Sequence, residues 1–130
     1  MRSKAANTNK VSCPVENTLK VIGGRWKVLI LRELFQGVKR FGQLHRALEG
    51  ITQKMLTQQL REMEADGIVN REVYLQVPPK VEYSLTPLGK SLKPVIDSMH
   101  EWGIRLFSRQ LQRQEPISNT LLEESPELSK

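Results

Sequence analysis

The 130-residue sequence contains a single cysteine, Cys13, and no long apolar run. One cysteine excludes an intramolecular disulfide and a cysteine-rich zinc site. The apolar runs, such as residues 28–31, are far shorter than the roughly 20 residues of a membrane-spanning helix. No apolar run follows the basic start of the sequence, so we expect no secretory signal. These absences predict a cytoplasmic protein with no membrane partner.

Patterns typical of enzymes are also missing. The two histidines, His45 and His100, lie far apart, and neither belongs to a metal-ligand or triad pattern. The pair Gly23-Gly24 indicates a helix break and not a nucleotide-binding loop. We therefore expect no enzyme activity and assign no catalytic residue, metal or cofactor. His45 is interpreted as a surface residue, with a phosphate contact as the alternative, and His100 as structural.

Positive charge is what the sequence has in excess. The net charge is +6, and the acidic end, residues 113–130, carries −2, which leaves +8 on residues 1–112. Such a basic domain favours a polyanionic partner, either nucleic acid or an anionic membrane surface. A merely soluble surface is the alternative. Composition divides the chain into a flexible N-terminal arm (1–12), one domain (13–111) and a disordered acidic tail (112–130).

Helical periodicity and capping signals predict five helices, over residues 14–22, 25–35, 41–48, 52–66 and 86–110. Thr52 is expected to cap the fourth helix. Pro94 is expected to kink or interrupt the last one. Two β-branched runs, residues 69–77 and 81–85, flank Pro78-Pro79 and predict a hairpin. This order indicates a mainly α-helical, winged helix-turn-helix fold with a small β-hairpin wing.

The helix predicted over residues 52–66 has two unlike faces. Its apolar residues gather on one side, which predicts packing against the domain. Arg and Lys suit guanine edges, Gln suits adenine, and Thr suits a thymine methyl group or a phosphate. The first amides of the helix, at Thr52, suit a phosphate as well. A solvated helix face is the alternative. The opposite side is polar, with two cations and no acid: Gln53, Lys54, Thr57, Gln58 and Arg61.

Four further cations are expected to contact the DNA backbone. Arg71 and Lys80 are predicted to flank the tip of the wing, where they could reach phosphates or the minor groove. Lys39 and Arg40 precede the third helix and are expected to position the protein without specifying a sequence. Scattered surface charges are the alternative interpretation for Arg71 and Lys80.

The last predicted helix carries more apolar residues than one edge of a small domain can bury. A second copy of the chain is the expected partner, with dimerisation through the terminal helices. A symmetric dimer matches a palindromic double-stranded operator. Packing inside one subunit is the alternative. The predicted interface residues are Leu92, Val95, Ile96, Met99, Trp102 and Leu106.

Cys13 directly precedes the first predicted helix. A helix N-terminus stabilises a thiolate, and Lys10 is close in sequence. Cys13 is therefore a candidate oxidant-sensing thiol, with an inert cysteine as the alternative.

Seven short motifs resemble those of the HxlR-type winged-helix regulators of bacteria, which have a MarR-like arrangement. They are CPV (13–15), GRWK (24–27), RFGQL (40–44), ITQKMLT (51–57), QLR (59–61), VPPKVEYSLT (77–86) and EWG (101–103). The resemblance covers about residues 13–106. It implies a homodimeric DNA-binding transcriptional regulator that acts as an activator or as a repressor.

Some members of that family sense oxidants or electrophiles through a cysteine in the position of Cys13. With one cysteine, the chemistry would be an intermolecular disulfide, a mixed disulfide with a small thiol, or electrophile addition. Two alternatives for the protein stay open. One is a winged-helix protein-interaction module, whose groove face could carry acidic or apolar residues. The other is a regulator that responds to an unknown small-molecule ligand.

Overall fold

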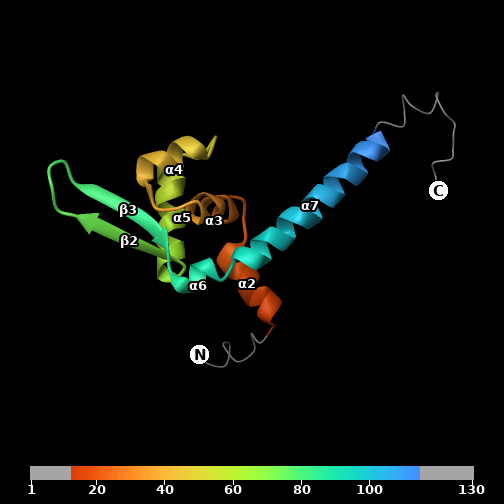
Figure 1. Ribbon diagram of the computed structural model, residues 1–130, viewed down its shortest axis with the longest axis horizontal. Coiled ribbons are helices and arrows are strands. Elements are labelled where there is room, and N and C mark those ends of the chain that lie inside the picture. The colour runs from red at the N-terminus through yellow and green to blue at the C-terminus, as the bar shows by residue number, and fades with distance from the viewer. Residues whose placement is uncertain (1–12, 115–130) are drawn as a thin grey trace. The chain divides into compact units, whose positions relative to one another are not determined.

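The computed structural model describes residues 13–114 (Figure 1), and these form two compact units that divide between Lys93 and Pro94. The predictions for residues 1–12 and 115–130 lie outside the described residues. No helix in the described part is long and apolar enough to cross a membrane. The elements are α2 (Pro14–Ile22), α3 (Trp26–Phe35), β1 (Lys39–Arg40), α4 (Phe41–Ala47), α5 (Gln53–Ala65), β2 (Val69–Tyr74), β3 (Lys80–Leu85), α6 (Pro87–Lys90) and α7 (Lys93–Gln114).

The first unit is a helical cluster with a small antiparallel sheet, as predicted for a winged helix. The hairpin of β2 and β3 extends away from α3, α4 and α5 (Figure 1). β3 is the middle strand of the order β1-β3-β2, and Val69 pairs with Leu85 where β2 begins. The mainly α-helical winged helix-turn-helix fold is therefore confirmed.

Strand β1 was not predicted. Lys39 and Arg40 were expected in a connection before the third helix, but they pair with Tyr83 and Glu82 of β3. Two residues are too few to show the alternation that reveals a strand in a sequence. Their pairing joins the start of α4 to the wing.

Strand β2 is shorter than expected. It ends at Tyr74, whereas the sequence predicted a strand to Val77. Leu75 and Val77 are 95% and 98% exposed, so their apolar side chains do not contribute to a packed face. Pro78 and Pro79 have no amide to donate to a ladder, which favours a loop at this point.

The core lies where α3, α4, α5 and β3 meet. Leu56, Leu60 and Met63 of α5 are buried, in agreement with the apolar side predicted for this helix. Met55 differs, since its side chain is 36% exposed in the first turn of the helix. The other buried apolar residues of this unit are Ile22, Ile30, Leu31, Leu34, Leu44, Leu48, Ile51, Ile68, Val69, Tyr83 and Leu85.

The last predicted helix is interrupted, as expected from Pro94. α6 ends at Lys90, and α7 begins at Lys93. Pro94 has no amide hydrogen for the carbonyl group of Lys90, and its ring would clash with the preceding turn, so a continuous helix is disfavoured. Leu92 therefore lies between the two helices and not on a single apolar stripe. α7 continues to Gln114, so residues 112–114, which were assigned to the tail, are helical.

Candidate nucleic-acid interface

The turn between α4 and α5 sets where α5 begins. Gly50 has a φ of +94°, a backbone conformation that glycine adopts readily. Ile51 is buried, which anchors the turn to the core. The Thr52 side-chain oxygen accepts a hydrogen bond from the amide of Met55 at 3.0 Å, so Thr52 is the predicted N-cap.

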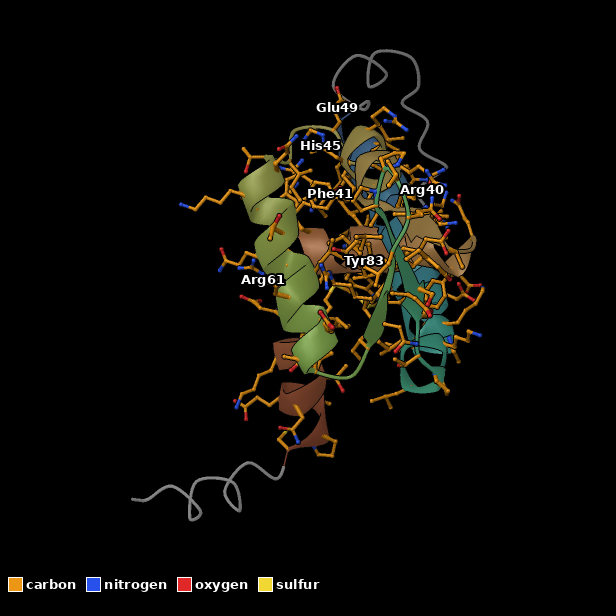
Figure 2. All side chains as sticks on the ribbon, turned by 90° about the vertical axis from the view of Figure 1, so that its left-hand side faces the viewer. Arg40, Phe41, His45, Glu49, Arg61 and Tyr83 are labelled. Atoms are coloured by element: carbon orange, nitrogen blue, oxygen red, sulfur yellow. The ribbon has the colours of Figure 1, made fainter. Side chains whose placement is uncertain are left out.

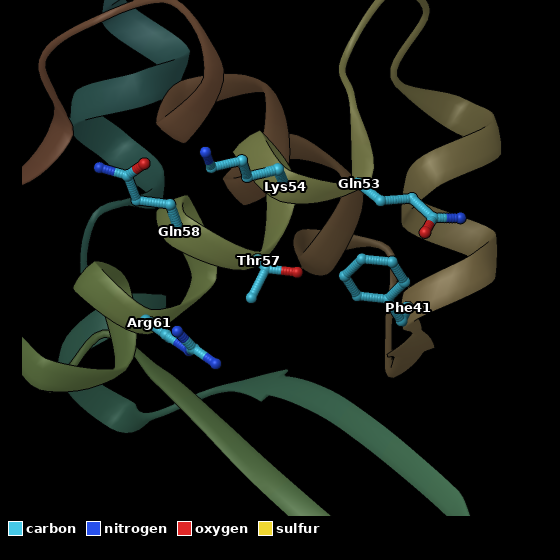
Figure 3. Close-up of a pocket in the computed structure, with 6 residues that line it drawn as sticks. All are labelled: Phe41, Gln53, Lys54, Thr57, Gln58 and Arg61. Carbon is cyan, nitrogen blue, oxygen red and sulfur yellow. The ribbon is translucent and has the colours of Figure 1, made fainter.

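The polar side chains predicted on α5 share one open surface. Five of them line a concavity of about 610 Å³ together with Phe41 from α4: Gln53, Lys54, Thr57, Gln58 and Arg61. Figure 3 shows them projecting from α5, with the Phe41 ring of the neighbouring helix beside Gln53 and Thr57. Thr57 is half-buried and the other four are exposed. We call this set, with Phe41, the α5 surface.

Phe41 was not among the residues predicted for this site. It is half-buried, and its ring stacks on that of His45, with centroids 6.4 Å apart and planes 6° apart. Figure 2 shows both rings on α4, close to the start of α5. Phe41 therefore adds an apolar rim to a surface that is otherwise polar.

The positive charge of the α5 surface is not neutralised within the described residues. Neither Lys54 nor Arg61 forms an ion pair with an acidic side chain there. No acidic residue lines the concavity. Both cations are therefore available to an anionic or hydrogen-bond-accepting partner.

Arg71 lies nearer to α5 than the sequence indicated. It pairs with Tyr83 in the middle of the hairpin, so the expectation that it flanks the tip was wrong. Arg71 and Arg61 line a second concavity, of about 300 Å³, with Thr57, Leu60, Glu64 and Tyr83. The pairs Glu72–Glu82, Val73–Val81 and Tyr74–Lys80 lie between Arg71 and the tip.

Lys39 and Lys80 have acidic neighbours. The Lys39 ammonium lies 3.7 Å from Glu33. The Lys80 ammonium lies 3.6 Å from Glu82 and 4.6 Å from the centre of the Tyr74 ring. These pairs lower the charge that the two lysines present to a partner.

Acidic side chains near the tip of the hairpin also shift the pKa of a tyrosine. The negative charge of Glu72, followed by desolvation and Glu82, raises the pKa of Tyr74.

Arg40 differs from Lys39 and Lys80, because its side chain is exposed and forms no ion pair in the described part of the chain. Its amide instead donates to the Gln43 side chain at 2.8 Å.

An ion pair that the sequence did not reveal joins α3 to α5. Lys27 is 8% exposed, and its ammonium lies 2.6 Å from Oε1 of Glu62. Gln58 donates its side-chain amide to Oε2 of Glu62 at 3.3 Å. The hydrogen bond from Lys27, then that from Gln58, and the charge of Lys27 lower the pKa of Glu62 below its ordinary value of 4.5. The signal in the sequence was a lysine inside an apolar helix.

Cys13 is exposed at the N-cap position of α2. Its side chain makes no capping hydrogen bond, and its carbonyl oxygen accepts from the amide of Asn17 at 3.1 Å. Between residues 13 and 114, no group of three or more His, Cys, Asp or Glu side chains could hold a metal ion.

Helix α7 presents an apolar stripe. Val95, Met99, Trp102 and Leu106 follow one another at helical spacing, and all four are exposed, Trp102 by 58%. Ile96 is buried, unlike its neighbours. Three further exposed apolar residues on this helix were not predicted: Ile104, Phe107 and Leu111.

Comparison with known proteins identifies this arrangement. The family model described as HxlR-like helix-turn-helix matches residues 21–124. The chain belongs to the HxlR-like helix-turn-helix family. The regulator resemblance found in the motifs is thereby confirmed, and this HxlR-like protein is a transcriptional regulator of the helix-turn-helix type. DNA binding is a property of that class.

Three relatives illustrate the similarity. The HTH-type transcriptional regulator YybR of Bacillus subtilis is 60% identical over 95 residues, which are 73% of this chain and 76% of YybR. The redox regulator HypR in its oxidized form is 59% identical, with a TM-score of 0.68 over 72% of this chain and 96% of HypR. The reduced form of the regulator YodB from B. subtilis is 39% identical, with a TM-score of 0.64 over 71% and 91% of the two chains.

The ion pair of Lys27 and Glu62 predicts how stability depends on pH. The pKa of Glu62 is lower in the folded protein than in the unfolded chain, so folding favours the ionised carboxylate. Its stabilising contribution is complete above the ordinary value of 4.5 and disappears as the pH falls through the folded-state pKa. We expect the difference in unfolding free energy between wild type and Glu62→Gln to shrink as the pH falls below 4.5. Urea unfolding at a series of pH values from neutral to acidic measures it.

Asp66→Asn is the matched control, because it removes the same charge from the end of the same helix. Asp66 caps α5 through its backbone amide, which the substitution keeps. A Glu62→Gln profile that parallels that of Asp66→Asn at every pH would contradict the role given to the ion pair.

Proposed function

We propose that this regulator binds double-stranded DNA sequence-specifically as a homodimer, with α5 in the major groove of each half-site. The observation that carries the proposal is the α5 surface, where polar side chains lie on one accessible side of a well-anchored helix with two cations that form no ion pair within residues 13–114. Major-groove base edges offer acceptors and donors that such side chains can bind.

The residues of the α5 surface suit different tasks. Arg61 and Lys54 can donate hydrogen bonds to guanine, and Gln53 and Gln58 can pair with adenine. Thr57 can contact a thymine methyl group. Thr52 places the free amides of the first turn where a phosphate would bind. Arg71 shares a concavity with Arg61, which supports a phosphate contact beside the groove. Arg40 would contact the DNA backbone. Lys39 and Lys80 would do so as well, after exchanging their acidic partners for phosphates.

Arg61→Ala and Lys54→Ala test this assignment. Each is expected to weaken binding to the operator by about 1–3 kcal/mol if the residue reads a base. The measurement is a mobility-shift titration with the DNA upstream of the neighbouring gene. Arg32→Ala is the matched control, because it removes an exposed cation from α3, outside the α5 surface. Unchanged affinity in both test variants would place the reading surface elsewhere.

Salt dependence separates DNA binding from a protein-interaction role. Phosphate contacts release counterions, so the affinity should fall steeply as the salt concentration rises. A protein-interaction module would show no shift with this DNA even at low salt. The lack of acidic residues lining the α5 surface argues against that alternative.

The homodimer is supported by the apolar stripe of α7. Four large apolar side chains on one helix face are exposed in a single chain, and a second copy of the same stripe would cover them. Two α5 helices related by a two-fold axis would read half-sites about one helical turn of DNA apart, in a palindromic operator. Ile96 is already buried, so it would contribute less to such an interface than predicted.

Trp102→Glu is expected to convert the dimer to monomer, because it places a charge in the centre of the stripe. Sedimentation equilibrium measures the mass, and circular dichroism checks that α7 remains helical. Leu75→Glu is the control, since Leu75 is 95% exposed on the wing and lies outside the stripe. A dimer that persists in folded Trp102→Glu protein, or a monomeric wild type, would refute this interface.

A second part of the proposal gives Cys13 a role as an oxidant sensor. The similarity to HypR, named a redox regulator, favours it, and the thiol is exposed before α2. A hydroperoxide would oxidise the thiol to a sulfenic acid while being reduced to an alcohol or water. A second thiol, from the other subunit or from a small molecule, would then condense with it to a disulfide and release water. Electrophile addition is the alternative modification.

Cys13→Ser should bind the operator as well as wild type does, because Cys13 lies outside the α5 surface. Hydroperoxide should change DNA binding by the wild type only, and a thiol reductant should reverse the change. Mass spectrometry identifies the partner of Cys13. An equal response of Cys13→Ser to oxidant would end the redox proposal and favour regulation by an unknown small-molecule ligand.

A further inference from the structure

The two oxygens of the Glu62 carboxylate have different partners. Oε1 accepts from the ammonium of Lys27 at 2.6 Å, and Oε2 accepts from the side-chain amide of Gln58 at 3.3 Å. Lys27 comes from the core side of α5, whereas Gln58 belongs to the α5 surface. The carboxylate therefore connects a buried cation to an exposed amide.

We infer that Glu62, held by Lys27, is a positioning residue that fixes the amide of Gln58 and makes it select adenine. The inference rests on the proposed major-groove role of α5. It adds Glu62, which contacts no base, to the residues that determine sequence preference. Gln58 lines the same concavity as Lys54 and Arg61, and Figure 3 shows its side chain extending to the same side of α5 as that of Lys54.

The direction of the amide follows from hydrogen-bond chemistry. An ionised carboxylate has only acceptors, so Glu62 binds the nitrogen end of the Gln58 amide and not the oxygen end. The lowered pKa of Glu62 keeps that carboxylate ionised near neutral pH. Gln58 is left with its carbonyl oxygen and one N–H for other partners.

This remaining pair complements adenine. In the major groove, adenine offers the N6 amino group as a donor and N7 as an acceptor. Guanine offers two acceptors, N7 and O6, which would place an oxygen against the carbonyl oxygen of Gln58. If the amide were free to rotate by half a turn, it could present its NH₂ group outward and accept guanine or thymine.

Lys27 is needed because Glu62 is an acid beside a DNA-binding surface. Without a neutralising partner, its carboxylate would repel phosphates. The buried ammonium binds it from the core side, where the chain offers no other acid within an ion-pair distance of Lys27 among the described residues. The pair also limits rotation of α5 about its own axis relative to α3.

The experiment uses the full chain and a library of duplexes with a randomised central segment. Bound duplexes are sequenced for wild type, Glu62→Gln, Glu62→Asp, Gln58→Ala and the charge-matched control Asp66→Asn. Glu62→Asp keeps an anion for Lys27 but shortens the side chain that holds Gln58, so it serves if Glu62→Gln does not fold. Circular dichroism melting verifies folding of each variant.

Wild type and Asp66→Asn should favour adenine at one position of each half-site, and Gln58→Ala should lose that preference. Each folded Glu62 variant should lower the preference for adenine over guanine there by at least about fivefold, the lower limit for one bidentate base contact. The base preferences at other positions should be unchanged. A general loss of stability would weaken those preferences as well.

Three results would overturn the inference. They are an unchanged preference in a folded Glu62 variant, an unchanged preference in Gln58→Ala, and a Gln58-dependent preference for guanine. Each of these leaves the proposed function intact if Arg61 or Lys54 still determines other positions. No enriched sequence with wild type would instead refute sequence-specific binding itself.

Discussion

The position of every candidate DNA contact on α5 depends on how the helix is rotated against the core. Leu56, Leu60 and Met63 are almost completely buried, and their common side therefore fixes which residues point outward. Burial of such side chains stabilises a fold by about 1.5–3 kcal/mol each, far more than a surface polar contact. Rotation that exposed them would be unfavourable, so the outward set is determined by the apolar side chains and not by the polar ones themselves.

This dependence explains what could be predicted from the sequence. Apolar periodicity in α5 is strong, and the structure places the opposite polar residues together as expected. Thr52 was recognised as a cap because a hydroxyl group before a helix has a specific local role. The assignment of individual DNA contacts remains a prediction.

The parts that could not be predicted depend on contacts between distant segments. Strand β1 is defined only by its pairing with β3, more than 40 residues away in the chain. Phe41 belongs to the α5 surface because α4 and α5 meet there. Lys27 is buried because α5 supplies Glu62, and nothing near Lys27 in the sequence indicates that partner. Arg71 shows the same effect, since the hairpin register decides where it lies.

Pairing of β1 with β3 also affects how the sheet meets other molecules. Unpaired strand edges are templates for intermolecular association. In the sheet formed by the described residues, β3 is the most buried strand, and it has a neighbour on both sides. The free edges belong to the two-residue β1 and to β2, which carries the charged side chains of Arg71 and Glu72 on opposite faces. The small strand thus covers the edge of β3 at Tyr83 and Glu82, where another chain could otherwise pair.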